Sequence, residues 1–409
     1  MNKKAVPVGD LQFGMYIAEL DRPWTETPFA FQGFWLQTDR QLAALRKFCK
    51  HVFIDAAKSQ AKGTAPRRPA RPEPDPTVPA FEIHGNADYA RPTDLPREIE
   101  AATLVYSRTC EALEELLEPL ERGATRLEGA EVAKLVEQLA DSVIRNPEAL
   151  LLLSKVREIR TPAHARALQV SVYMMVFGRF LQREPDEIEL LGLLGLLQDV
   201  GMVRMPAALI LKHGPLTEQE AQVMKRHVEL SAHILGITTG LPPKLANLAL
   251  LHHERQDGSG YPRRLRGYQL GLPGSIAAIC DAYETMLAPP PYGEGQAPGD
   301  AIKHLVKGRG SAFHGPLLEQ FIRCMGAFPV GSTVELTSGD FGVVVGEHLM
   351  QRLTPKVLLL IDRTGKLLID RTGKLVRSPR IVDLAAEPDI RIRRTLEQGQ
   401  LAFDPRRLF

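Results

Sequence analysis

Cysteine is scarce in this sequence, and long apolar runs are missing. Four cysteines lie far apart with no CxxC pair among them: Cys49, Cys110, Cys280 and Cys324. They indicate buried thiols of a reduced, cytoplasmic protein and argue against a disulfide or zinc framework. The opening residues, MNKKAVPVGD, contain no apolar signal core, and no apolar stretch reaches the length of a membrane span. We therefore expect a soluble protein with no membrane contact.

An excess of charge of either sign is also missing. The chain has 51 Lys and Arg side chains against 49 Asp and Glu, a net charge of +2. This balance argues against a dedicated nucleic-acid binder, so we expect no DNA partner. The chain is, however, long and rich in apolar residues: it has 409 residues, and 44% of them are hydrophobic. Two or three domains with cores of their own are therefore possible.

The first part of the chain predicts a small module followed by a linker. Residues 1–58 combine strand-like runs, GMYIAEL and HVFID, with a helix-like stretch, RQLAALRKFCK, and predict an α/β module. Five aromatic residues are expected in its core: Trp24, Phe29, Phe31, Phe34 and Trp35. Residues 59–97 include TAPRRPARPEPDPTVPA, which cannot continue a helix because proline lacks an N–H and fixes its own φ. We predict an extended linker there.

The rest of the chain predicts a mainly α protein with a β-rich end. Residues 98–328 repeat apolar side chains at helical spacing, and Thr217 and Glu220 have the spacing of a capping box, so a helical bundle is expected. Residues 329–409 contain GSTVELTSGDFGVVVGE and KVLLLID, which indicate a β-rich appendage. Within it, IDRTGKL occurs at 361–367 and again at 369–375, a local duplication that lengthens a hairpin.

The stretch HHERQDGSGYP, residues 252–262, carries the clearest chemical signal. Three further donors stand at the edges of apolar helical runs, and with the histidine pair the candidates are Asp199, His227, His252, His253 and Asp281. Taken singly, each has an ordinary structural explanation as a helix cap or a hydrogen-bonded group. A helical bundle, however, builds metal sites by converging such side chains. Mixed His and Asp ligation suits iron, manganese or zinc and is too rich in nitrogen for calcium.

The glycine-rich half of this stretch suits a bound phosphate. Gly258 and Gly260 let backbone amides approach an anion closely, and Tyr261 offers a stacking face or a hydroxyl. The alternative is an ordinary tight turn, because Asp-Gly-Ser-Gly is also common turn chemistry. The uninterrupted combination HHE…DGSGYP is more specific than either half.

Together with PLTEQEAQVMKRHV before it and AAICDAYE after it, this stretch resembles the HD-GYP family of HD-type metal-dependent phosphohydrolases, over about residues 150–325. The opening VPVGDLQFGMYIAELDRPW resembles a small domain of unknown function that commonly precedes HD-GYP domains in bacteria. The resemblance implies an all-helical HD-type bundle with two or three metal ions, often iron or manganese. It also implies hydrolysis of the second messenger cyclic di-GMP.

Carried over by position, the resemblance implies metal ligands at the five residues Asp199, His227, His252, His253 and Asp281, with Asp199 also catalytic. The retained turn and the arginines around it could bind a dianionic dinucleotide, through Arg255, Gly258, Gly260, Tyr261, Pro262 and Arg264. The alternative for the arginines is a solvated basic turn. In an ungapped comparison three family positions have changed: two histidines are replaced by Arg166 and Gln198, and a lysine by Met202. His164 could substitute for the first histidine only if the helix register shifts. An amide is a poor ligand, and a permanent guanidinium charge repels a cation. We therefore expect one iron or manganese ion, or a weakly bound one, in place of a dinuclear cluster.

Three functions follow from this pattern. The first is a bacterial signalling protein with a degenerate HD-GYP domain, which binds cyclic di-GMP or a protein partner with weak or no hydrolysis. The second is a working phosphodiesterase that yields pGpG or GMP. The third is a scaffold that binds neither metal nor nucleotide. Arg166 and Gln198 favour the first over the second, and the intact HHERQDGSGYP argues against the third.

Overall fold

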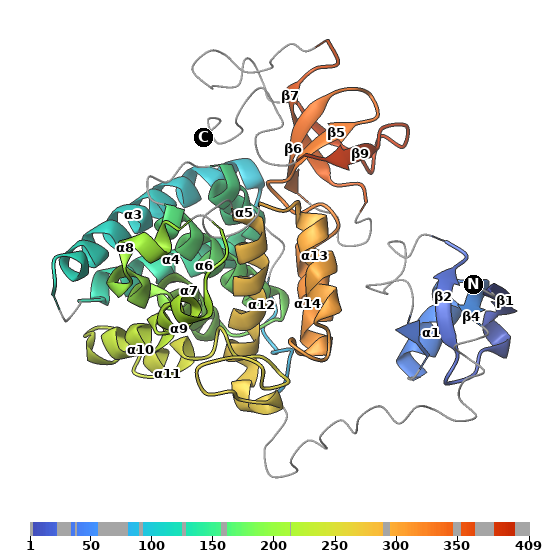
Figure 1. The fold of residues 1–409 in the computed structure, drawn as a ribbon. Coiled ribbons are helices and arrows are strands. Elements are labelled where there is room, and N and C mark those ends of the chain that lie inside the picture. Colours follow the sequence, from blue (N-terminus) through green and yellow to red (C-terminus); the bar gives the residue numbers. More distant parts are fainter. Residues whose placement is uncertain are drawn as a thin grey trace. The chain divides into compact units, whose positions relative to one another are not determined.

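The computed structural model describes residues 3–22, 34–36, 39–55, 81–89, 93–124, 128–156, 162–212, 214–288, 295–346, 353–364 and 380–396. The chain forms two compact units (Figure 1). The first comprises Met1–Thr77 and Glu347–Thr354, and the second comprises Val78–Gly346 and Pro355–Phe409. No helix in the described ranges is long and apolar enough to cross a membrane.

The N-terminal unit is an antiparallel sheet with one helix, as predicted for an α/β module. Its strand order is β1 (Lys3–Pro7), β4 (His51–Asp55), β2 (Tyr16–Leu20) and β3 (Phe34–Trp35). The short helix η1 (Val8–Asp10) follows β1, and α1 (Asp39–Phe48) precedes β4. The core consists of aliphatic side chains from these elements: Val6, Leu11, Ile17, Leu20, Leu36, Leu45, Val52 and Ile54. Trp24, Phe29 and Phe31, predicted as core, lie outside the described residues, and of Phe34 and Trp35 only the strand is described.

The second unit is the predicted helical bundle. Its first helices are α3 (Leu95–Glu121), α4 (Ala130–Arg145), α5 (Pro147–Val156), α6 (Pro162–Phe180) and α7 (Pro185–Leu197). Shorter elements follow: η4 (Val200–Arg204), α8 (Ala207–Ile210), α9 (Glu218–Lys225), α10 (His227–Ile237), α11 (Leu245–Ala249) and η5 (Gly267–Leu270). The last three are α12 (Gly271–Leu287), α13 (Pro298–Lys307) and α14 (Gly315–Met325). The capping box predicted at Thr217 and Glu220 begins α9.

Helices α6 and α7 form the centre of the bundle, because they are apolar on every side. All residues at 168–178 and 190–198 are buried. Gly195 lets the two helices approach closely, since a Cβ at that position would lie 2.7 Å from the Cα of Ser171. Helix α12 packs against both. Side chains near the start of α6, just after the end of α7 and within α12 meet in the interior, where Arg166 pairs with Asp199 and Asp281.

The C-terminal residues of the same unit form the predicted β-rich region. Its antiparallel strand order is β8 (Ile381–Asp383), β7 (Lys356–Ile361), β6 (Phe341–Gly346), β5 (Thr333–Leu336) and β9 (Ile392–Thr395). Leu152 of α5 is buried in its core together with Val334, Val344 and Leu360. Most of the IDRTGKL repeat lies outside the described residues.

Candidate metal centre

The site begins where α7 ends and the chain turns into η4. Asp199 stands at that junction, and Gly201 follows it. A Cβ at Gly201 would lie 2.3 Å from the carbonyl oxygen of His227, so only glycine allows η4 to lie this close to α10. The amide of Gly201 also donates a hydrogen bond of 2.8 Å to the hydroxyl of Ser231. This close contact brings the Asp199 carboxylate next to the first histidine of α10.

Two imidazoles face one oxygen of Asp199. Its Oδ1 lies 3.2 Å from Nε2 of His227 and 3.3 Å from Nε2 of His252, and the two nitrogens are 3.4 Å apart. The Nδ1 atoms of both rings point away, each 2.7 Å from a backbone carbonyl oxygen, of Met224 and Ala249 respectively. A carbonyl can only accept, so each Nδ1 carries the proton and each Nε2 is left with its lone pair. This is the arrangement that metal-binding histidines have.

His253 completes a group of four donors. One ligand atom from each of Asp199, His227, His252 and His253 lies within 4.8 Å of the others. The His253 ring stacks on Tyr261, with centroids 4.7 Å apart. Burial and the neighbouring His252 hold the pKa of His253 well below its ordinary value, so this ring stays neutral and able to bind a cation.

The pKa values of two further members of the group, His227 and Asp199, are shifted in opposite directions. Burial opposes the charged form of His227, but in that form Nε2 gains a proton that it can donate to Asp199, and this interaction outweighs burial and raises the pKa. Burial likewise opposes ionisation of Asp199, but the charge of Arg166 and the two imidazoles hold its pKa well below the usual range. Asp199 is therefore a carboxylate near neutral pH.

Arg166, on α6, reaches into the same place and pairs with two carboxylates. One terminal nitrogen donates to Oδ2 of Asp199 at 2.5 Å. The other donates to Oδ1 of Asp281 and, at 2.9 Å, to the hydroxyl of Thr285. Burial alone would lower the pKa of Arg166, but the charges of Asp281 and Asp199 raise it, so the guanidinium stays protonated. Of the five predicted ligands, four come together within 4.8 Å. Asp281 borders them, with Oδ1 paired to the guanidinium and Oδ2 3.5 Å from Nδ1 of His253.

Gln198, just before Asp199, lies beside this pair. Gln198 is fully buried, with Nε2 3.5 Å from Oδ1 of Asp281. Its Oε1 is buried with no hydrogen-bond partner among the described residues. Met202 is half-buried in η4. Three imidazole nitrogens and one carboxylate oxygen suit a first-row transition ion, so the donors present fit one such ion. On the side of Gln198, the possible donors are its own amide and the carboxylate of Asp281, which is already paired with Arg166.

A second ion pair lies behind Arg166 and was not predicted. Lys155 of α5 is 3.3 Å from the carboxylate of Glu284 on α12, and its ammonium also lies over the Tyr173 ring, 5.1 Å from the centroid. Burial raises the pKa of Glu284, although Lys155 and Arg166 oppose the rise. A lysine in the mixed stretch SKVREIR gives no sequence signal for this pairing, because its partner is 129 residues away.

The glycine-rich turn is held in place by Glu254, which the sequence did not mark as a site residue. This side chain is fully buried and accepts hydrogen bonds from the amides of Arg263 (2.6 Å) and Leu265 (2.9 Å). Gly260 packs on the backbone just before the turn, where a Cβ would lie 2.5 Å from the amide nitrogen of Arg255. The signal available in the sequence was an acid directly after two candidate ligands.

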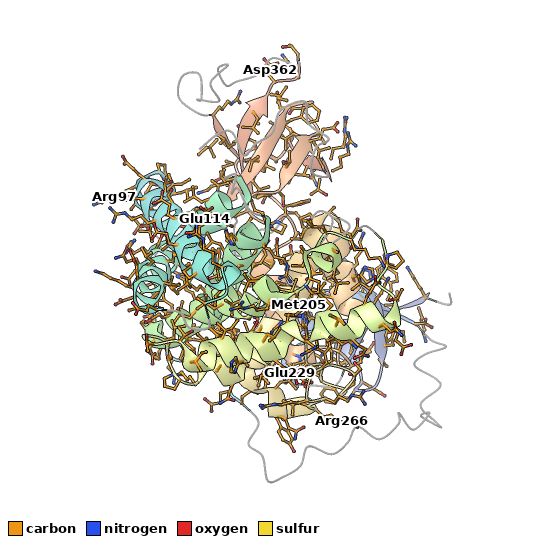
Figure 2. The ribbon with its side chains drawn as sticks, turned by 60° about the vertical axis from the view of Figure 1, so that its left-hand side comes forward. Arg97, Glu114, Met205, Glu229, Arg266 and Asp362 are labelled. Atoms are coloured by element: carbon orange, nitrogen blue, oxygen red, sulfur yellow. The ribbon has the colours of Figure 1, made fainter. Side chains whose placement is uncertain are left out.

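Most of the predicted nucleotide-contacting residues line one cavity of about 390 Å³. Its lining includes Gly258, Gly260, Tyr261, Pro262 and Arg264, together with Lys225, Arg226 and Glu229. The Lys225 ammonium lies 5.1 Å from the centroid of the Tyr261 ring. Figure 2 shows Glu229 on the helix that borders this cavity and Arg266, just past the turn, on the same side of the unit.

Arg255 has a different environment from the other predicted nucleotide contacts. Its guanidinium donates to the backbone carbonyls of His252 (3.1 Å) and Glu254 (2.8 Å). It also lies over the Phe313 ring, 5.4 Å from the centroid. These contacts direct the side chain at the protein interior, where it supports the backbone of the histidine pair.

Comparison with known proteins places this architecture in a family. Residues 3–126 match a domain of unknown function, and residues 149–317 match the HD domain. The chain is 30% identical, over 89% of its length and 86% of the relative's, to the cyclic di-GMP phosphodiesterase PA4108 of Pseudomonas aeruginosa. It is 31% identical to a cyclic di-GMP phosphodiesterase of Vibrio cholerae, over 47% of the chain and 44% of that protein.

The chain is also similar to a solved structure, that of Bd1817, a HDG"Y"P protein from Bdellovibrio bacteriovorus. The superposition covers 78% of this chain and 98% of Bd1817, with 14% sequence identity and a TM-score of 0.47. The identity to PA4108 extends over nearly the whole chain, through both matched domains and the HHERQDGSGYP stretch. The chain therefore belongs to the HD-GYP family of HD-domain phosphohydrolases.

Proposed function

We propose that this protein is a cyclic di-GMP signalling protein whose HD-GYP domain binds the nucleotide, or a protein partner, with weak or no hydrolysis. The observation that carries the proposal is the guanidinium of Arg166 between Asp199 and Asp281. The curated relatives are named as cyclic di-GMP phosphodiesterases, which supports this nucleotide as the ligand.

The loss of hydrolysis follows from the charges and ligands around Asp199. A pair of bound divalent ions would supply an activated hydroxide and neutralise the phosphate. Here one oxygen of Asp199 faces the imidazoles and the other is hydrogen-bonded to Arg166, so the carboxylate is engaged on both sides. Asp199, His227, His252 and His253 would hold a single iron or manganese ion. Gln198 and Met202 supply neither an imidazole nor a cation.

Nucleotide binding is supported by the cavity beside the donors. The cavity lining carries three positive charges, from Lys225, Arg226 and Arg264, and one negative charge, from Glu229. Cationic walls attract a dianionic dinucleotide, and a planar guanidinium can pair with or stack on guanine. Tyr261 connects the cavity to the metal centre, since its ring contacts both His253 and Lys225.

A direct test measures binding and turnover in the same preparation. Calorimetry should detect cyclic di-GMP binding to anaerobically purified protein, and chromatography should detect no pGpG or GMP after incubation with Mn²⁺ or Fe²⁺. Arg264→Ala should weaken binding at least tenfold. Arg97→Ala is the matched control, because Arg97 is exposed on α3, away from the cavity (Figure 2). Equal binding by both variants would contradict the assignment of the cavity.

The second candidate function is a working phosphodiesterase that yields pGpG or GMP. It is favoured by the four converging donors and by the names of the relatives. Steady turnover with added Mn²⁺ or Fe²⁺, abolished by His252→Ala, would establish it in place of the first.

A further inference from the structure

We infer that the guanidinium of Arg166 permanently takes the place of a second metal ion, so that this centre is complete with one ion. The inference rests on the proposed function in one respect: it assumes that Asp199, His227, His252 and His253 hold a metal ion. Arg166 is thus a positioning residue that fixes two carboxylates, and not merely a ligand that has been lost.

The contacts of Arg166 are those expected of a substitute cation. It bridges the carboxylates of Asp199 and Asp281, which belong to different segments of the chain, and adds a hydrogen bond to Thr285. Its side chain is only 13% exposed, and the Asp281 side chain only 2%. With both terminal nitrogens donating to protein acceptors, the guanidinium is part of the interior and is not directed at a ligand in the cavity.

The charge balance of the interior supports the same conclusion. Three carboxyl groups face this region, from Asp199, Asp281 and Glu284, and two cationic side chains pair with them, Arg166 and Lys155. With all three carboxyl groups ionised, these side chains carry a net charge of −1, and one divalent ion on the imidazole side would change it to +1. A second divalent ion would add two charges beside a guanidinium that cannot release its proton, which is strongly unfavourable away from water.

The orientation of Asp199 divides the pocket into two halves. Its Oδ1 faces the two Nε2 lone pairs, and its Oδ2 faces Arg166. The half with the imidazoles therefore remains available to one ion while Arg166 is in place. The other half contains Arg166, Oδ1 of Asp281 and Oε1 of Gln198, which has no hydrogen-bond partner among the described residues. Oδ2 of Asp281 lies at the border of the two halves, 3.5 Å from Nδ1 of His253.

The test counts metal ions and measures thermal stability in the absence of nucleotide. Wild-type protein titrated with Mn²⁺ should bind one ion per chain by native mass spectrometry. Arg166→His, which removes the fixed charge and supplies a neutral ligand, should bind a second equivalent and gain more in melting temperature from Mn²⁺ than wild type does. Arg166→Lys retains the charge and should stay at one ion.

A matched control removes a comparable arginine elsewhere. Arg145 on α4 donates two 2.9 Å hydrogen bonds to Glu98, a carboxylate that is 3% exposed and lies outside the site. Arg145→His should lower the melting temperature without any rescue by Mn²⁺. The Arg145 side chain is 46% exposed, so this control separates the loss of a partly buried ion pair from a vacancy that a metal can fill.

Two results would overturn the inference. One is two Mn²⁺ ions per wild-type chain, and the other is an Arg166→His variant that is folded and binds no more metal than wild type. If Arg166→His folds only with Mn²⁺ present, that dependence is itself the predicted rescue. If it fails to fold in either condition, Arg166→Gln must show the rescue, and its failure as well refutes the inference. Loss of nucleotide binding alone would contradict the proposed function and leave this inference standing.

Discussion

Glu254 offers a quantitative test of how the turn beside the metal centre is held. Its carboxylate is 0% exposed and accepts two backbone hydrogen bonds, from the amides of Arg263 and Leu265. Glu254→Gln keeps the shape of the side chain and one acceptor oxygen, but it turns an NH₂ group toward the second amide. At one of the two amides, the hydrogen bond is then replaced by two N–H groups that face each other. At the other amide, the acceptor oxygen remains but no longer carries a negative charge.

The magnitude follows from the two bonds. A hydrogen bond to a charged acceptor contributes about 1.5–3 kcal/mol, and a buried donor without a partner costs about as much. We therefore expect Glu254→Gln to lower the free energy of unfolding by about 2–4 kcal/mol. At about 2 °C per kcal/mol for a unit of this size, the melting temperature should fall by about 4–8 °C.

Circular dichroism at 222 nm follows the helical unit and is a suitable assay. Glu100→Gln is the control, because Glu100 is exposed on α3, and its effect should stay within about 0.5 kcal/mol. The reasoning would be refuted if the two variants melted within 1 °C of each other. A large shift with unchanged cyclic di-GMP binding would instead show that the turn keeps its shape without Glu254.

Three further predictions concern the centre and the N-terminal unit. Gly201→Ala should lower both the melting temperature and the affinity for Mn²⁺, because its Cβ would meet the carbonyl of His227 at 2.3 Å; unchanged Mn²⁺ titrations would contradict this. His252→Ala should reduce the metal content of the purified protein by elemental analysis, and metal retained at the wild-type level would exclude this ligand. Burial raises the pKa of Cys49 to about 11. Iodoacetamide should therefore label this thiol slowly at pH 8 in native protein and faster as the pH rises toward 11, as measured by peptide mass spectrometry. Rapid labelling at pH 8 would show an accessible thiolate.

The local parts of this architecture could be predicted from the sequence. Apolar residues at helical spacing indicated α3 and α4, and Thr217 with Glu220 marked a helix start that the structure confirms. The histidine pair at 252–253 pointed to a metal centre, and the converging donors agree with that prediction. These features depend on residues that are neighbours in the chain, so their spacing carries the information.

The remaining parts of the site depend on partners far apart in the chain. Arg166 could be judged in advance only as a residue that repels a cation, because Asp281 lies 115 residues further on. The pairing of Lys155 with Glu284 was hidden for the same reason. Arg255 was assigned to the nucleotide from its charge, yet its guanidinium contacts backbone carbonyls, an outcome that only the packing of the turn decides.

Anomalous diffraction from crystals grown with excess Mn²⁺ tests the central claim most directly. The account predicts one peak, bounded by Oδ1 of Asp199 and the Nε2 atoms of His227 and His252, with Arg166 still paired to Asp199 and Asp281. Two peaks sharing Asp199, with the Arg166 side chain displaced from between the carboxylates, would contradict it.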